Sequence, residues 1–196
     1  APCYMRGVKE SGVLTNVKHF AANNQETDRK TIQETISERA LYEIYFPAFE
    51  SCVKEGQADT VMTAYNWING EACAHSKWLI QDVLRGQWGF EGMVVSDWGG
   101  VYDRVKGIKA HTDLTMPVSD PQSVIQAVKD GILSEEDLDI CAEHYLNALV
   151  EMPVMKGRKY TCLDSAQSAE AGYEAAAEGM VLLKNENGAL PLSAGN

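Results

Sequence analysis

The feature that most constrains the fold is an alternation of short apolar runs with helical patterns in the first half of the chain. Three runs read as strands, at residues 13–20, 60–66 and 93–95. These strands are separated by longer segments in which apolar residues recur at helical spacing. Strands that alternate with helices are typical of a parallel sheet with helices packed outside it. The sequence therefore predicts an α/β fold.

The helices between these runs have recognisable start signals. Thr31 and Glu34 form a candidate capping box, and apolar residues follow at every fourth position from 32 to 44. We expect Pro47 to break or kink this helix and to begin a second one, because proline has no N–H and suits a first helical turn. A further helix is expected from Ser76, its cap, to about residue 85.

Helices predominate in the second half of the chain. The Asp120–Pro121 pair predicts one helix start, and Ser134 with Asp137 is a second candidate capping box before a long helical pattern. The remaining segments read, in order, as a linker, an alanine-rich helix and a strand, at residues 153–164, 165–179 and 180–185.

Each of the three early strands ends in polar or aromatic side chains. These pairs are Lys18 and His19, Tyr65 and Asn66, and Asp97 and Trp98. In parallel α/β architectures, ligands bind at the carboxyl ends of the strands. Core packing alone does not explain three consecutive strand ends of this kind, so we predict a ligand site there.

Asp97 could act in this site as a metal ligand, a general base, a nucleophile or a structural anchor. A metal site needs further carboxylates or histidines, whereas the neighbouring ends supply one imidazole and an ammonium that repels cations. The set suits a sugar, because an indole can lie against the ring while Lys18 and His19 bond its hydroxyls. An ionised Asp97 could then attack or stabilise an oxocarbenium ion. These residues predict a carbohydrate site without establishing the reaction.

Composition argues against several classes of partner. The formal net charge is −11, which argues against nucleic acid or an anionic membrane as the main partner. No apolar run approaches the roughly 20 residues of a transmembrane helix. The 5 cysteines include no CxxC pair, and reduced core cysteines are favoured over a disulfide framework, which leans toward a reducing compartment such as the cytoplasm.

The sequence resembles glycoside hydrolase family 3, on its β-glucosidase side. The matching motifs occur in the family's order and cover nearly the whole chain: VKHFAANNQET (17–27), SERALYEIYFPAFE (37–50), VMTAYNWINGEAC (61–73), LIQDVLRGQWGFEGMVVSDWGG (79–100), TDLTMP (112–117), DGILSEEDLD (130–139) and AAAEGMVLLKNENGALPL (175–192). Each motif alone is weak, but the ordered set is specific.

The resemblance implies a TIM-like barrel followed by an α/β sandwich domain. Residues 1–152 would be the C-terminal part of the barrel, 153–164 a linker, and 165–196 the start of the sandwich with its first strand. The chain begins without a methionine, and we expect it to be a piece of a longer enzyme whose remainder is its partner.

The resemblance also implies roles for individual residues. Asp97 matches the nucleophile that forms a covalent glycosyl-enzyme, and Trp98 the aromatic residue beside the bound sugar. Lys18 and His19 match a pair that bonds the sugar hydroxyls. Tyr65 matches the tyrosine beside the nucleophile, with core packing as its alternative, and Met62 matches a pocket-lining position, with a core position equally open.

The expected activity is that of a retaining β-glucosidase acting on terminal β-glucosyl residues of β-glucosides or β-linked gluco-oligosaccharides. The family's acid/base glutamate matches no residue of this chain, and no metal or organic cofactor is implied. A β-xylosidase or dual-specificity enzyme stays open, as does a non-catalytic sugar-binding protein. His75, His111 and His144 are expected on the surface or in helices rather than as ligands.

Overall fold

A computed structural model describes residues 1–117, 121–158 and 165–193 of the chain. The chain divides into two compact units, residues 1–158 and 159–196. The division falls inside the segment 153–164 that the sequence predicts as a linker. The assignment of the two units to separate domains stays a prediction.

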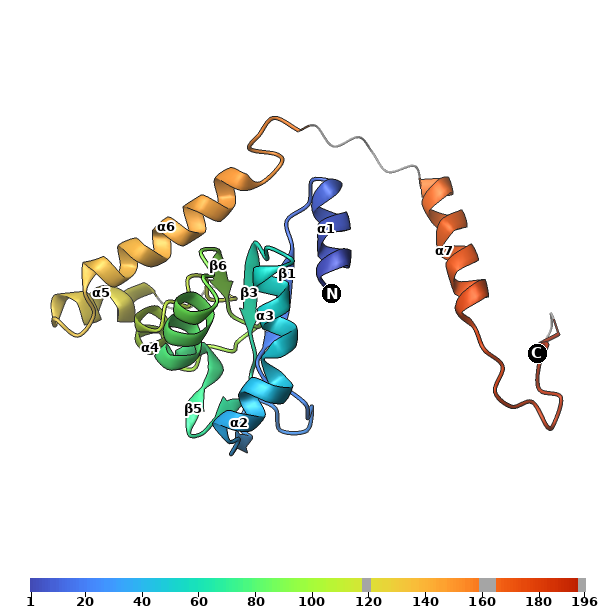
Figure 1. Ribbon diagram of the computed structural model, residues 1–196, viewed down its shortest axis with the longest axis horizontal. Coiled ribbons are helices and arrows are strands. Elements are labelled where there is room, and N and C mark those ends of the chain that lie inside the picture. Colours follow the sequence, from blue (N-terminus) through green and yellow to red (C-terminus); the bar gives the residue numbers. More distant parts are fainter. Residues whose placement is uncertain (118–120, 159–164, 194–196) are drawn as a thin grey trace. The chain divides into compact units, whose positions relative to one another are not determined.

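The first unit is built on a parallel sheet (Figure 1). Its strands lie in the order β1 (Asn16–Phe20), β3 (Thr60–Thr63) and β6 (Met93–Val95). Val61 on the central strand pairs with Val17 on one side and Val94 on the other. Leu114 forms a further parallel bridge with Val95, beyond β6. The three predicted strands and their parallel arrangement are confirmed.

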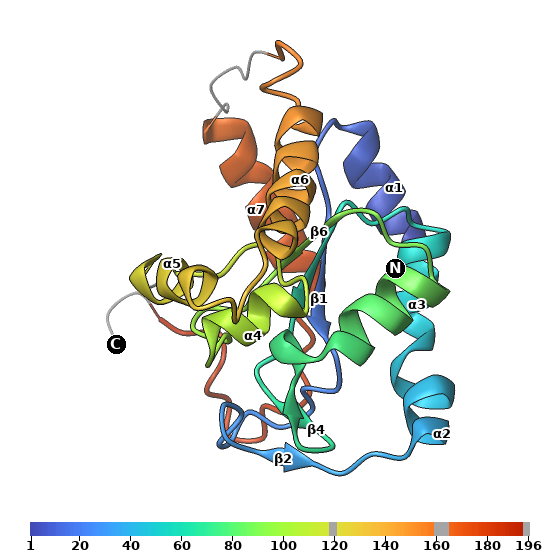
Figure 2. The ribbon, with the colours of Figure 1, turned by 90° about the vertical axis from the view of Figure 1, so that its left-hand side faces the viewer.

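Helices connect the strands and lie alongside the sheet (Figure 2). Their apolar side chains share one core with those of the strands. The connections are α2 (Glu38–Ala40), η1 (Leu41–Tyr45) and α3 (Pro47–Lys54) after β1, and η2 (Cys73–His75) and η3 (Trp78–Gln87) after β3. Phe20, Phe46, Leu79, Leu84 and Val94 form the centre of this core, each at most 1% exposed. Helix α1 (Pro2–Glu10) precedes the sheet.

The predicted helix start at Thr31 and Glu34 is wrong. Gln33–Glu34 instead forms the short strand β2, which pairs with β4 (Trp67–Ile68), and β4 turns back into β5 (Glu71–Ala72). The helix begins at Glu38, where the Ser37 hydroxyl accepts a hydrogen bond from the Ala40 N–H. Hydrogen bonds to β4, more than thirty residues away in the sequence, outweigh the local capping signal.

The other helix signals agree with the structure. Pro47 is the first residue of α3, after the wide turn of η1 in which the Phe46 N–H bonds the Leu41 carbonyl. The Ser76 hydroxyl accepts from the Leu79 N–H, and the helix extends two residues past the predicted end.

Helices α4 (Arg104–Lys109), α5 (Pro121–Lys129) and α6 (Glu135–Glu151) follow β6 and share a smaller core. This core contains Ile108, Ala127, Leu133 and Cys141. Ser134 caps α6 as predicted, whereas Asp120 lies outside the described residues.

The second unit contains helix α7 (Ser165–Gly179), as predicted. Its described residues include no strand, so the strand expected at 180–185 is not formed in this chain. A strand is defined by hydrogen bonds to a neighbour, and the described part of this unit contributes no second strand to provide them. In neither unit do the described helices combine the length and apolarity that crossing a membrane requires.

Candidate active site

The parallel sheet brings the predicted residues of β1 and β6 together at its carboxyl edge. The Nε2 atom of His19, near the end of β1, lies 3.3 Å from Oδ2 of Asp97, which follows β6. The two side chains are about one-third and one-sixth exposed (33% and 16%). The carboxylate is therefore desolvated on most sides but open to a ligand.

Asp97 is held by the segment that it begins. Its Oδ1 accepts a hydrogen bond of 2.6 Å from the Trp98 N–H. The Gly99 N–H donates to the Met116 carbonyl at 2.6 Å, and Gly99 has a φ of +75° that suits glycine. The chain thus turns sharply after the carboxylate and leaves it at the sheet edge.

Tyr65, which follows β3, reaches the same place. Its side chain is buried, and its hydroxyl donates to the Trp98 carbonyl at 2.7 Å. Burial raises the pKa of Tyr65, and the neighbouring Asp97 raises it further. The phenol therefore stays protonated at neutral pH and remains a hydrogen-bond donor beside the carboxylate.

The other predicted residues differ in their surroundings. The Trp98 indole is 60% exposed, which leaves its surface available. Lys18 is also exposed. Met62 is half-buried on β3, where it pairs with Val95. Asn66, at the end of β3, is fully buried and bonds the Ala21 carbonyl, so its role is structural.

Two cations near Tyr65 were missed by the sequence analysis. The Arg29 guanidinium lies 4.5 Å from the Tyr65 ring centroid, and the Lys30 ammonium lies 5.1 Å from it. Both belong to the loop after β1. The only signal in the sequence that could have predicted them is that both are basic residues in the loop that follows β1.

A second missed group holds the far end of the segment after Asp97. The Tyr102 hydroxyl donates to the Tyr65 carbonyl at 2.8 Å, and its ring stacks on Trp67 with centroids 5.7 Å apart. His75 lies in the short helix η2, one of the two expected positions, and is buried; its Nε2 accepts from the N–H groups of Tyr102 and Asp103.

A third missed group lies beneath the site. Asp113 has a fully buried carboxylate that accepts from Arg85 Nη2 at 2.8 Å and from the Val94 N–H at 2.6 Å. Its other oxygen lies 2.8 Å from Nδ1 of His144 on α6. Asp113 thus ties η3, β6 and α6 together just before the strand end that carries Asp97.

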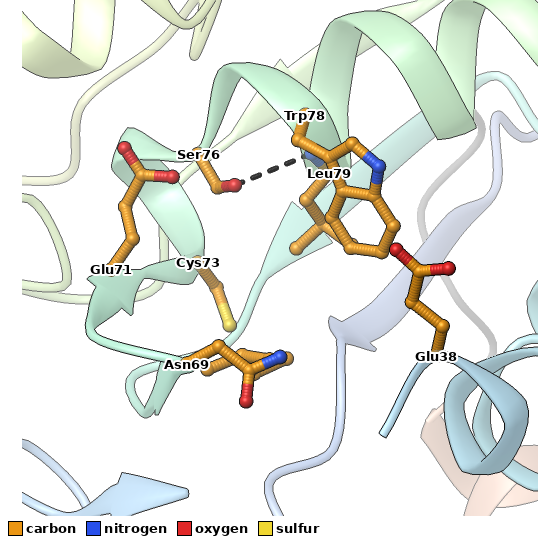
Figure 3. A pocket seen from close by; sticks show the side chains of 8 residues that line it. Glu38, Asn69, Glu71, Cys73, Ser76, Trp78 and Leu79 are labelled. Carbon is orange, nitrogen blue, oxygen red and sulfur yellow. Dashed lines mark hydrogen bonds between the residues drawn. The ribbon is translucent and has the colours of Figure 1, made fainter. Parts of the chain in front are cut away.

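A separate hollow of about 250 Å³ lies between the β4–β5 hairpin and the start of η3 (Figure 3). Glu38 and Glu71 lie on opposite sides of it, with the Trp78 ring between them. The amide of Asn69 is bonded to the backbone of Ile36 at both ends. The Ser76 hydroxyl likewise accepts a hydrogen bond from the Leu79 N–H. The strand-end residues do not line this hollow.

Across residues 1–117, 121–158 and 165–193, no group of three His, Cys, Asp or Glu side chains could hold a metal ion. The four described cysteines are free thiols, of which Cys52, Cys73 and Cys141 are buried. Cys162 lies outside the described residues.

Comparison with known proteins identifies the family. Residues 1–148 match the model of the glycosyl hydrolase family 3 N-terminal domain. The chain is 43% identical over 195 residues to thermostable beta-glucosidase B of Acetivibrio thermocellus, covering 98% of this chain and 26% of that protein. It is 44% identical over 192 residues to an exo-alpha-(1->6)-L-arabinopyranosidase of Bifidobacterium longum, covering 97% and 25%.

Solved structures agree with this assignment. Beta-glucosidase 3B of Thermotoga neapolitana, in complex with glycerol, matches with a TM-score of 0.84 and 45% identity over 98% of this chain and 28% of that chain. The chain therefore spans about a quarter of the length of these relatives. The sheet of the first unit corresponds to part of the TIM-like barrel of these relatives. The chain belongs to glycoside hydrolase family 3.

Proposed function

We propose that the protein containing this chain is a retaining β-glycosidase whose nucleophile is Asp97. The observation that carries the proposal is the position of this carboxylate. It lies at the carboxyl end of a parallel strand, next to His19 and an exposed indole. Catalytic groups occupy this edge in TIM-like barrels, and membership of a glycosidase family makes glycoside cleavage the reaction to test.

The first chemical step would form a bond between an Asp97 oxygen and the anomeric carbon of the sugar. The bond from that carbon to the leaving oxygen breaks, and an acid/base carboxylic acid protonates the leaving oxygen. Water, deprotonated by the same group, then hydrolyses the glycosyl ester and frees the carboxylate. We assign the acid/base group to a part of the enzyme outside this chain, about 5–5.5 Å from Asp97.

The neighbouring residues would bind the sugar and orient the nucleophile. Lys18 and His19 can bond hydroxyls, and the Trp98 indole can cover the apolar face of the ring. We propose that Tyr65 fixes the Asp97–Trp98 backbone through its bond to the Trp98 carbonyl. Met62 would line the pocket.

The loop after β1 adds one candidate to this set. The Arg29 guanidinium lies over the Tyr65 ring, which places a cation with several donors beside the site. A guanidinium can bond adjacent sugar hydroxyls, and its positive charge can also stabilise the ionised form of the Asp97 carboxylate.

We propose β-glucosides or β-linked gluco-oligosaccharides as substrates. The similarity to a β-glucosidase at 43% identity supports this choice. A pentopyranoside, such as a β-xyloside or an α-L-arabinopyranoside, is the second candidate, because the arabinopyranosidase relative is equally similar at 44%. Rates on the three aryl glycosides would rank the candidates.

The remainder of the enzyme would be the partner of this chain. We propose that residues 1–152 belong to the barrel, 153–164 to a linker and 165–196 to the next domain. Pairing with further strands from outside the chain would allow residues 180–185 to form the strand that they lack here.

The experiment that tests the proposed function is replacement of Asp97 by Asn in the full-length enzyme. The amide keeps the size of the side chain but is a poor nucleophile, so kcat on an aryl β-glycoside should fall by at least about 10³-fold. Asp82→Asn, at an exposed position on η3, is the matched control and should retain activity. Activity of Asp97→Asn within about tenfold of wild type would contradict the assignment.

A non-catalytic sugar-binding protein predicts a different result. Wild-type protein would then bind glucose or gluconolactone without turning over any of the three aryl glycosides. Turnover that depends on Asp97 excludes this alternative.

A further inference from the structure

We propose that His75 is a positioning residue for Asp97, acting as a neutral imidazole that anchors the far end of the 97–103 segment. The proposal rests on the proposed role of Asp97 as nucleophile. His75 itself lies outside the site and would touch no substrate.

The hydrogen bonds of His75 fix its protonation state. His75 is the last residue of the short helix η2 and is 6% exposed. Its Nε2 lies 3.1 Å from the backbone nitrogens of both Tyr102 and Asp103. A backbone N–H can only donate, so Nε2 must carry a lone pair and the ring proton must be on Nδ1.

The anchored segment begins at the nucleophile. Tyr102 donates through its hydroxyl to the Tyr65 carbonyl, and the Tyr65 hydroxyl donates to the Trp98 carbonyl. The Trp98 N–H in turn donates to Asp97. These hydrogen bonds, joined through the covalent structure of Tyr102, Tyr65 and Trp98, connect the imidazole to the carboxylate.

His75 also fixes where the next helix starts. Asp103 caps α4, because its Oδ1 accepts from the Lys106 N–H at 3.0 Å. Gly99 has a left-handed conformation near the other end of the segment. Because glycine allows many backbone conformations, the turn at Gly99 does not by itself hold the segment in place. The two hydrogen bonds to His75 hold its other end.

The surroundings favour the neutral form. Burial lowers the pKa of His75, and the charge of Lys106 lowers it further. Asp103 and Glu71, the facing carboxylates, act in the opposite direction but less than burial does. Tyr102, the other titratable group against the ring, stays neutral because its pKa is raised to about 12.

Acid should therefore weaken the anchor. The unfolded chain binds a proton at His75 at about pH 6.5, whereas the folded protein binds it only at lower pH. The contribution of the anchor is complete above about pH 6.5 and is lost as the pH falls through the folded pKa. A proton on Nε2 removes the acceptor of both N–H groups, and a displacement of the nucleophile by about 1 Å can cost about 10²-fold in rate.

The experiment compares His75→Leu and His75→Gln in the full-length enzyme. Leucine has no acceptor, so kcat should fall by about 10²-fold relative to wild type above about pH 6.5, and by less at lower pH, where wild type loses the same anchor. Glutamine offers a carbonyl oxygen that accepts two hydrogen bonds and takes up no proton, so it should restore most of that rate. The ratio of the glutamine variant's kcat to that of wild type should rise as the pH falls from about 6.5 to 5.

His111→Gln is the matched control. His111 is a partly buried histidine whose pKa is lowered by burial, as that of His75 is, but it contacts Asp137 on α6 at 3.6 Å. Its activity ratio to wild type should stay flat over the same pH range. The inference is overturned if the kcat of His75→Gln relative to wild type is also independent of pH. This comparison does not require the leucine variant to fold.

Hydrogen exchange separates this inference from the proposed function. Suppose that the Tyr102 and Asp103 amides exchange faster in His75→Leu, while an activated 2-deoxy-2-fluoro-β-glycoside does not label Asp97 in wild type. This result would support the anchoring role of His75 and contradict the assignment of Asp97 as nucleophile. Unchanged exchange of these amides would overturn the anchor itself.

Discussion

Replacing Asp113 by Asn should loosen the strand that carries the nucleophile. The Asp113 carboxylate is fully buried and bonds Arg85, His144 and the Val94 N–H at 2.6–2.8 Å. Asparagine is nearly the same size, so the substitution removes the charge while leaving little space. Its one carbonyl oxygen can keep the bond to Val94.

The magnitude follows from the contacts that are lost. Arg85 and His144 each lose a charge-assisted hydrogen bond, worth about 1.5–3 kcal/mol apiece. Arg85 also donates to the Gly92 carbonyl at 3.0 Å, which keeps it partly satisfied. Removing one partner of a buried pair typically costs about 3–5 kcal/mol, and we expect the lower end, about 3 kcal/mol.

Hydrogen–deuterium exchange of β6 in the full-length enzyme measures this cost locally. About 3 kcal/mol corresponds to opening of the strand about 10²-fold more often, so the Val94 amide should exchange faster by that factor. Glu50→Gln, which breaks the exposed pair with Lys54, is the control and should cost at most about 0.5 kcal/mol. Exchange at Val94 within about threefold of wild type would refute the reasoning.

Three further predictions test the site and the sheet. Trp98→Ala should raise KM about two- to tenfold without changing the melting temperature, since the ring is 60% exposed; an unchanged KM in steady-state kinetics would remove it from the sugar site. Gly92→Ala should destabilise the barrel by about 1–3 kcal/mol in denaturant unfolding, because the added Cβ would lie 2.2 Å from the Asp59 carbonyl oxygen; equal midpoints would contradict this. The folded pKa values of Tyr65 and Tyr102 are raised, that of Tyr102 to about 12, so the folded state should lose stability as the pH rises from about 10. In Tyr102→Phe the melting temperature should therefore fall less than in wild type over this pH range. An equal fall in the two proteins would show that the Tyr102 phenol is not involved.

The sequence predicted the elements whose signals are local. The strands at 16–20, 60–63 and 93–95 were recognisable because their apolar runs are bounded by clear breaks. Ser134 also signalled its helix start correctly, because a cap depends only on residues within one turn. At Gln33–Glu34 the local signal failed, since pairing with a strand near residue 67 decided the structure.

The candidate site shows the same division. His19 and Asp97 could be placed together because parallel strands bring their carboxyl ends to one edge. The supporting residues were not predicted, because each acts through partners far away in the sequence. His75 bonds residues 27 and 28 positions later, and Asp113 bonds a histidine 31 positions later. Single-sequence patterns carry no information on such pairings.

The most direct test of the central claim is covalent labelling of the full-length enzyme with an activated 2-deoxy-2-fluoro-β-glycoside of its preferred sugar. The tryptic peptide of residues 86–104 contains three carboxylates, those of Glu91, Asp97 and Asp103, so fragment-ion sequencing must locate the adduct. Our account predicts one fluoroglycosyl group on Asp97. An adduct on another residue, or none in an enzyme that hydrolyses the parent glycoside with net retention, would contradict it.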